Sequence, residues 1–108
     1  MDTKALNELV EGILAIFNNQ VMRIVLYGSY ARGTNMSESD VDVALLLNGN
    51  LNGNTEDKLS DLVVDLNLKY DRVFSVIDID YAVFKKCEKV TRFYRNMNKE
   101  GIILWKAA

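Results

Sequence analysis

The chain has 108 residues, 49% hydrophobic and 26% charged, which predicts one soluble domain, residues 1–108, with no room for a second, substrate-binding domain. Its 13 basic residues are outnumbered by 15 acidic ones, which argues against a nucleic-acid partner, because phosphate backbones are held by concentrated positive charge. No apolar run approaches the ~20 residues that span a membrane, and the single Cys87 excludes an internal disulfide and is typical of a cytoplasmic protein.

The first two elements are predicted to be a helix and a buried strand. Apolar side chains recur at three- and four-residue spacing from Asp2 to Phe17, which indicates one apolar face of a helix that ends at Asn18-Asn19. Val21–Tyr27 is rich in aliphatic and β-branched residues, which is typical of a central strand. We expect this helix to pack on the sheet and to carry no chemistry.

A glycine follows the strand directly, and we interpret it as part of a phosphate site. Gly28 lets the backbone turn sharply and lets a ligand approach, and Ser29–Arg32 is predicted to form the first turn of a short helix. The amides of that turn and the Ser29 hydroxyl then form an anion cradle. Gly28 and Ser29 are therefore candidates to bind the β- and γ-phosphates of a nucleoside triphosphate, although a plain turn glycine is the simpler alternative. Arg32 either binds phosphate or acceptor, or holds the loop to a nearby carboxylate.

The second strand carries two carboxylates on one face. After a turn-rich connection, Gly33–Ser39, the strand is predicted over Asp40–Leu47. Because side chains alternate along a strand, Asp40 and Asp42 share one face while the aliphatic residues between and after them enter the core. Adjacent like charges disfavour ionisation unless a cation lies between them. With no histidine in the chain, oxygen ligands predict Mg²⁺, or alternatively Mn²⁺, rather than zinc.

The remaining elements complete an alternation of helices and strands. An amphipathic helix over Thr55–Tyr70, with Thr55 as its cap, precedes a strand over Asp71–Ile79, and this order predicts a crossover between parallel strands. We then expect a short helix or turn at Asp80–Cys87, a helix at Thr91–Lys99 that Gly101 ends, and an edge strand at Ile102–Trp105.

A third acidic ligand is uncertain from the sequence. The candidates are Asp71, Asp78 and Asp80 at the two ends of the third strand. If Phe74 and Val76 enter the core, Ser75 stands on the carboxylate face and no third carboxylate does; if the faces are reversed, Asp78 reaches the site. We favour the first arrangement, which weakens catalysis, because a hydroxyl is a poor Mg²⁺ ligand. Asp78 and Asp80 are then expected to cap the following helix.

The chain resembles a known superfamily at Gly28-Ser29-x-x-Arg32-Gly33 and at Ser39-Asp40-x-Asp42 with the aliphatic run behind it. This signature is similar to that of the nucleotidyltransferases that include DNA polymerase beta, the aminoglycoside nucleotidyltransferases and the minimal nucleotidyltransferases (MNT). The resemblance covers most of the chain. It implies an α/β protein with the polymerase beta-like nucleotidyltransferase fold, a small mixed sheet with helices packed mainly on one face. It also implies that Asp40 and Asp42 are catalytic ligands of two Mg²⁺ ions.

The resemblance implies a reaction and a partner as well. A minimal nucleotidyltransferase is expected to transfer a nucleoside monophosphate, here AMP from ATP, to a hydroxyl acceptor. The family's usual partner is a small helical HEPN protein with which it forms a toxin–antitoxin pair, and the acceptor is a tyrosine of that toxin. The alternative is a catalytically weak or inactive module of the same fold that binds a partner protein, and the uncertain third carboxylate favours it.

Overall fold

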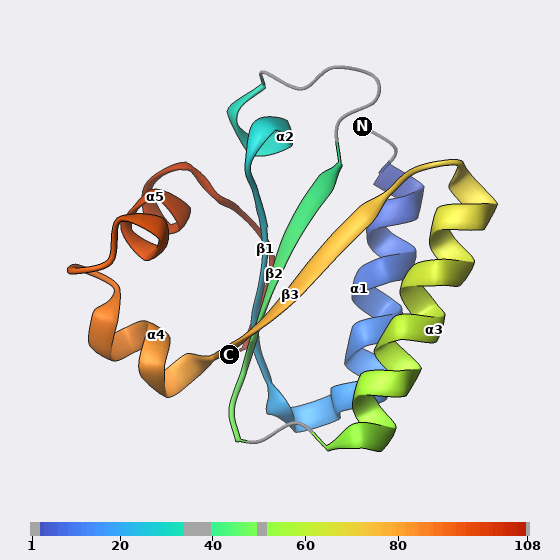
Figure 1. Cartoon of the computed structure of the whole chain (residues 1–108), viewed down its shortest axis with the longest axis horizontal. Coiled ribbons are helices and arrows are strands. Elements are labelled where there is room, and N and C mark those ends of the chain that lie inside the picture. The colour runs from blue at the N-terminus through green and yellow to red at the C-terminus, as the bar shows by residue number, and fades with distance from the viewer. Residues whose placement is uncertain (1–2, 34–39, 50–51, 108) are drawn as a thin grey trace.

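The fold is a mixed four-stranded sheet between two unequal helical layers (Figure 1). The computed structural model describes residues 3–33, 40–49 and 52–107. The strands, in the order β3-β2-β1-β4, are β1 (Val21–Tyr27), β2 (Val41–Leu47), β3 (Phe74–Asp80) and β4 (Ile102–Lys106). Strand β1 is antiparallel to both β2 and β4, whereas β2 and β3 are parallel and joined through a helix. The predicted α/β class, crossover and edge strand are confirmed.

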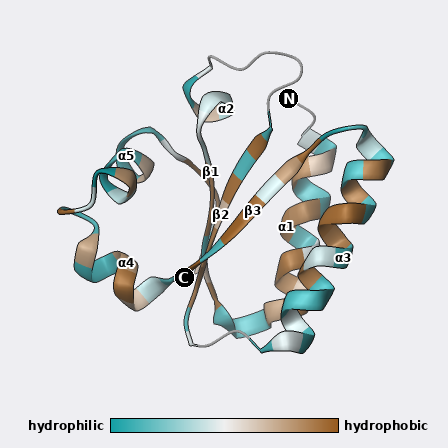
Figure 2. Cartoon of the chain, in the orientation of Figure 1, coloured by the Kyte–Doolittle hydropathy of each residue, from teal (hydrophilic) through white to brown (hydrophobic). Residues whose placement is uncertain are grey.

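The larger layer consists of α1 (Thr3–Phe17) and α3 (Gly53–Tyr70), which lie side by side on one face of the sheet (Figure 1). Their apolar faces meet the aliphatic side of β2, and Figure 2 shows the apolar residues concentrated along the strands and on parts of these helices. Removing such side chains from water supplies the main favourable term for folding. The fully buried members of this core include Leu9, Ile13, Ile24, Val41, Val43 and Leu45.

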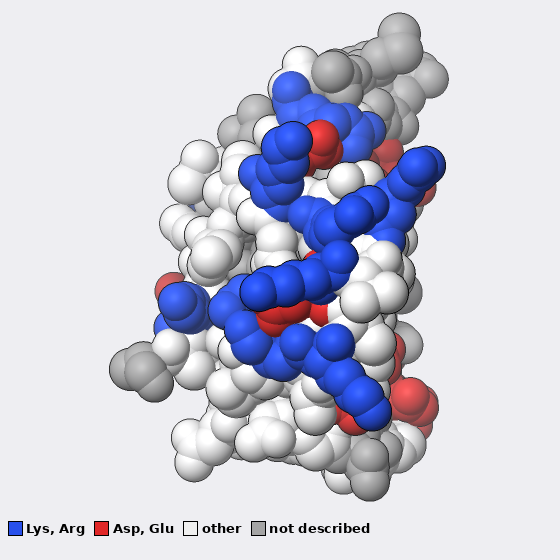
Figure 3. Space-filling model, turned by 90° about the vertical axis from the view of Figure 1, so that its left-hand side faces the viewer, with Lys and Arg blue, Asp and Glu red and all other residues white. Residues whose placement is uncertain are grey.

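A smaller layer, not assigned to a face by the sequence, covers part of the other side of the sheet. It consists of α4 (Tyr81–Cys87) and α5 (Arg92–Glu100), which bury Phe84 and Met97 against Ala44 and Leu46 of β2. Helices therefore pack mainly, but not only, on one face. Lys and Arg side chains gather on the outer surface of this layer (Figure 3).

The helix ends follow ordinary capping chemistry. The side chain of Asn52 caps α3 by accepting a hydrogen bond from the Thr55 amide at 2.9 Å, so the prediction that Thr55 is the cap was wrong by one turn. Asp80 caps α4 by accepting from the Ala82 amide at 2.9 Å, as expected. A short 3-10 helix, η1 (Asn18–Gln20), links α1 to β1. Within the described ranges, no helix is long and apolar enough to cross a membrane.

Candidate active site

One row of side chains crosses the carboxylate face of the sheet. The register pairs Tyr27 of β1 with Asp42 of β2, and Asp42 with Ser75 of β3. This is the face that carries α4 and α5. The row lies nearer the end of the sheet than the small apolar core that these two helices form with β2. Asp42 is partly buried, and Asp40, just before β2, is exposed. Strand β2 begins at Val41, one residue later than the predicted strand from Asp40, and both aspartates lie at its N-terminal end.

Gly28 lies directly against Asp42, and this contact distinguishes it from a plain turn glycine. Its dihedral angles, φ 75° and ψ −153°, belong to a region that side chains essentially exclude. A Cβ atom added to Gly28 would stand 2.5 Å from Oδ2 of Asp42, so a larger residue would displace the carboxylate. The predicted short helix is present as α2 (Ser29–Arg32), and no side chain caps its first turn.

Arg32 lies between two acidic groups. Its Nη1 is 3.7 Å from Oε2 of Glu100 at the end of α5, and both side chains are exposed. Its charge also acts on Asp42, where it offsets part of the rise in pKa that burial and Asp40 cause. The contact with Glu100 favours the interpretation that Arg32 holds the loop to a carboxylate. Residues 34–39 of the predicted connection, including Ser39 of the motif, lie outside the described residues.

The electrostatics of the row favour a cation. Burial, then the neighbouring Asp40, raise the pKa of Asp42, and Arg32 offsets only part of this. Burial and the charge of Asp42 raise the pKa of Tyr27 in turn. Both shifts have a common origin, because negative charge is concentrated where the surroundings hydrate it poorly. A bound divalent cation would remove this penalty.

The third carboxylate is absent from this face in the part of the chain that the structure describes. Phe74 and Val76 pack towards the core with α1 and α3, which confirms the favoured arrangement and leaves Ser75 beside Asp42. Asp78 lies on the opposite face, and Asp80 is occupied in capping α4. Nor does any group of three or more His, Cys, Asp or Glu among the described residues form a metal-binding cluster.

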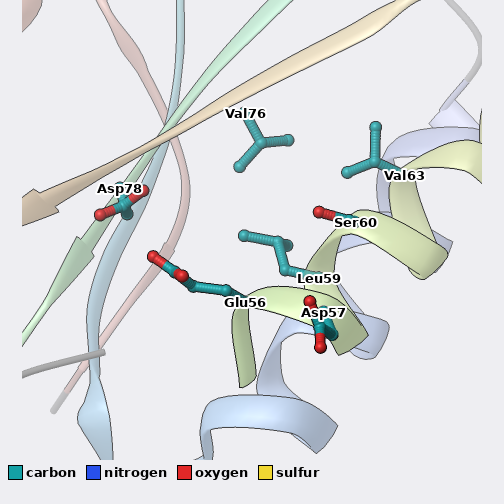
Figure 4. A pocket seen from close by; sticks show the side chains of 7 residues that line it. All are labelled: Glu56, Asp57, Leu59, Ser60, Val63, Val76 and Asp78. Atoms are coloured by element: carbon teal, nitrogen blue, oxygen red, sulfur yellow. The ribbon is translucent and has the colours of Figure 1, made fainter. Parts of the chain in front are cut away.

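Asp71 is not part of the third strand, for a backbone reason. It ends α3 in the left-handed conformation, with φ 52°, and precedes the start of β3 by three residues. The expected strand Asp71–Ile79 is therefore Phe74–Asp80. Asp78 instead lines an open pocket of about 350 Å³ between α3 and β3 (Figure 4). Glu56 and Asp57 of α3 line the same pocket, so it is separated from Asp42 by the sheet.

An aromatic contact beside the row was not predicted from the sequence. The Phe93 ring of α5 stands edge-on to the Tyr27 ring, with centroids 5.5 Å apart and planes at 82°. This contact brings α5 against the end of β1, directly before Gly28. No local spacing signals it, because the two residues are distant in sequence.

Gly28 and Ser29 thus directly follow β1, beside the antiparallel β2 that begins between Asp40 and Asp42. The chain belongs to the family described as "Polymerase beta, Nucleotidyltransferase", whose model matches residues 11–107. It is 34% identical over 106 residues to a Methanocaldococcus jannaschii protein named "putative protein adenylyltransferase", with 96% of this chain and 98% of the relative covered.

Solved structures show the same fold. The crystal structure of a toxin–antitoxin with AMP-PNP superposes with a TM-score of 0.63 at 24% identity, covering 94% of this chain and 73% of the matched chain. The tri-AMPylated Shewanella oneidensis HEPN toxin in complex with MNT antitoxin matches with a TM-score of 0.59 at 20% identity, covering 99% and 74%. The expected nucleotidyltransferase fold is thereby confirmed.

Proposed function

We propose that this chain transfers AMP from ATP to a tyrosine hydroxyl of a HEPN-type partner protein, as the antitoxin of a toxin–antitoxin pair. The observation that carries the proposal is the contact of Gly28 with Asp42 at the meeting of two antiparallel strands. The 34% identity to a relative named as a protein adenylyltransferase supports the reaction class. The toxin–antitoxin complexes that share the fold support the nucleotide and the kind of partner.

The two aspartates at the start of β2 fit Mg²⁺, with Mn²⁺ as the alternative. Asp40 and Asp42 supply the carboxylate oxygens that such hard cations prefer. Their mutual repulsion is relieved by a cation, and the missing side chain of Gly28 lets the Asp42 carboxylate lie against the backbone. These two aspartates would hold the metal ions. When bound, the metal lowers the pKa of the acceptor hydroxyl and neutralises the triphosphate.

The chain's own residues would bind and orient the nucleotide. The uncapped amides at the start of α2, with the Ser29 hydroxyl, offer donors to the β- and γ-phosphates. Gly28 allows the phosphates to approach the backbone. In the reaction the acceptor oxygen bonds to the α-phosphorus, the bond from that phosphorus to the pyrophosphate oxygen breaks, and pyrophosphate and the hydroxyl proton are released. Positioning supplies much of the rate of such a transfer.

The test compares the wild type with Asp40→Asn/Asp42→Asn. The wild type, with ATP, Mg²⁺ and the proposed HEPN-type partner protein, is expected to release pyrophosphate. The double variant should lose at least about 1,000-fold in rate, because removal of charge stabilisation at such a centre has effects of this size. It should still co-purify with the partner. Equal rates in the two proteins would contradict the proposal.

A second candidate function is a weak or inactive module that binds a partner protein. The observation that favours it is Ser75, which occupies the register position beside Asp42 where a third carboxylate would complete the metal site. A serine hydroxyl is a poor ligand for Mg²⁺ and is no base at neutral pH.

Ser75→Asp distinguishes the two candidates. If the chain is a weak enzyme, the added carboxylate should raise pyrophosphate release by about tenfold or more, within the range of general-base and metal-ligand contributions. Ser60→Asp adds the same charge on α3, on the other side of the sheet, and is the matched control. An inactive wild type that Ser75→Asp does not rescue, with the partner still bound, would favour the module.

A further inference from the structure

Positive charge is strongly segregated along the chain. Residues 81–108 contain seven Lys and Arg against two Glu, a net charge of +5, whereas residues 1–80 carry −7. The segment that follows β3 forms α4 and α5, and its cations cover one side of the molecule (Figure 3). We call this surface the basic face and define it by five exposed residues of α4, α5 and the connection between them: Lys86, Lys89, Arg92, Arg95 and Lys99.

Among the described residues, none of the five cations takes part in an ion pair. The two acidic residues of the segment are engaged elsewhere, because Glu88 pairs with Lys85 at 3.0 Å and Glu100 lies 3.7 Å from Arg32. The basic face therefore presents unneutralised charge to solvent, which attracts an acidic surface.

The basic face also exposes apolar side chains. Val90, between the two helices, is 80% exposed, Val83 of α4 is 46% exposed and Phe93 of α5 is 40% exposed. Exposed aliphatic and aromatic residues on the same segment as exposed cations have the composition of a protein interface, which combines apolar contacts with polar ones. A phosphate backbone offers no apolar surface for the two valines.

This surface adjoins the candidate active site through α5. Phe93 contacts Tyr27 directly before Gly28, and Glu100 at the other end of α5 lies near Arg32 of α2. A partner held on the basic face would therefore be positioned beside Asp42.

We infer that the basic face is the docking surface for an acidic region of the protein that presents the acceptor hydroxyl. The inference rests on the proposed function. It assigns the partner by charge: five unpaired cations with exposed valines fit an acidic protein surface that also has apolar residues. A long nucleic acid is disfavoured, because residues 1–80 repel it with a net charge of −7 and the two helices have only seven and nine residues.

Binding of a defined acidic polypeptide tests the inference without ATP or metal. The probe is a fluorescein-labelled random copolymer of glutamate and tyrosine, followed by fluorescence anisotropy at low salt. We expect the wild type to bind and Lys89→Glu/Arg92→Glu to bind about tenfold more weakly, the size expected for four units of exposed charge. The neutral variant Lys89→Gln/Arg92→Gln should fall between them. Lys89 and Arg92 are exposed, as are the two positions of the control described next, and circular dichroism checks that each variant folds.

The matched control is Lys4→Glu/Lys58→Glu, which makes the same change of charge on α1 and α3. It should keep most of the affinity. An equal loss in the control would overturn the inference, since net charge alone would then explain binding. Tighter binding of a mixed-sequence single-stranded RNA, lost in Lys89→Glu/Arg92→Glu, would also overturn it and assign the face to nucleic acid. This assay measures binding and not AMP transfer. A chain that fails to transfer AMP can still bind the copolymer, so failure of the proposed function is distinguishable from failure of this inference.

Discussion

Gly28 determines where the Asp42 carboxylate can lie, because a Cβ atom at this position would stand 2.5 Å from Oδ2 of Asp42. Gly28→Ala is expected to destabilise the fold by about 1–3 kcal/mol through its backbone conformation alone. It should also displace Asp42 and reduce AMP transfer by about 100-fold, the effect of a shift of about 1 Å in a reacting group. Urea unfolding and pyrophosphate release measure the two effects.

Gly33→Ala is the control for this prediction. Gly33 also has a positive φ, 74°, but no atom of the described residues lies within 4 Å of a Cβ built on it. Its replacement should therefore cost about 1 kcal/mol of strain and leave the transfer rate nearly unchanged. Equal losses of rate in the two variants would show that the contact with Asp42 has no special role.

Asp42 itself is expected to reduce stability when no metal is bound. Its pKa is raised in the fold by burial and by Asp40, so the folded chain holds the proton more tightly than the unfolded chain does. The resulting loss of stability is absent at pH values below the pKa of Asp42 in the unfolded chain. It is complete at pH values above the raised pKa of Asp42 in the folded chain. Asp42→Asn should therefore be more stable than the wild type at neutral pH by a few tenths of a kcal/mol, since the group is partly exposed.

Denaturation in EDTA at neutral and acid pH measures this difference. The advantage of Asp42→Asn should disappear as the pH falls through the raised pKa of Asp42. A wild type that is the more stable protein at neutral pH would contradict the electrostatic account of the site.

At the site, the sequence predicts the residues that depend on local spacing. The Asp40 and Asp42 pair follows from strand alternation, and Gly28 from its place after a buried strand. Ser75 required a choice between two faces, which only the register of β3 against β2 decides. Phe93 could not be found, because its contact with Tyr27 arises from tertiary packing.

At the scale of elements, the cap of α3 tests why this helix begins where it does. Asn52 accepts from the Thr55 amide at 2.9 Å, and Thr55 Oγ1 accepts from the Asn52 amide at 3.3 Å. Asn52→Ala should cost about 1 kcal/mol of stability, as the loss of an N-cap usually does. Asn54→Ala, an exposed position in the same first turn, is the control and should change stability little. Equal effects in thermal unfolding would rule out a capping role for Asn52.

The sequence predicts the central elements well because their signals are local. Strand β1 spans Val21–Tyr27 as expected, and α1 and α3 differ from prediction by no more than two residues at either end. The placement of α4 and α5 was not predictable. Each is short and buries a single large residue, Phe84 or Met97, so neither shows an apolar stripe that would identify its partner.

At the scale of the whole molecule, the two sides of the sheet carry different features. The side with α1 and α3 carries the main core and an acidic outer pocket. The other side carries the carboxylate row and, next to it, the basic face. The overall composition conceals the basic face, because the charge of +5 on residues 81–108 and the charge of −7 on residues 1–80 sum to −2.

The most direct test of the proposed transfer is intact-mass analysis of the chain and the proposed HEPN-type partner. Both are incubated together with Mg²⁺ and, separately, with each nucleoside triphosphate. We predict that the partner gains the mass of one or more AMP groups with ATP, and that Asp40→Asn/Asp42→Asn abolishes the gain. No added mass on either protein with any nucleotide, while the two still co-purify, would contradict the enzyme and favour a binding module.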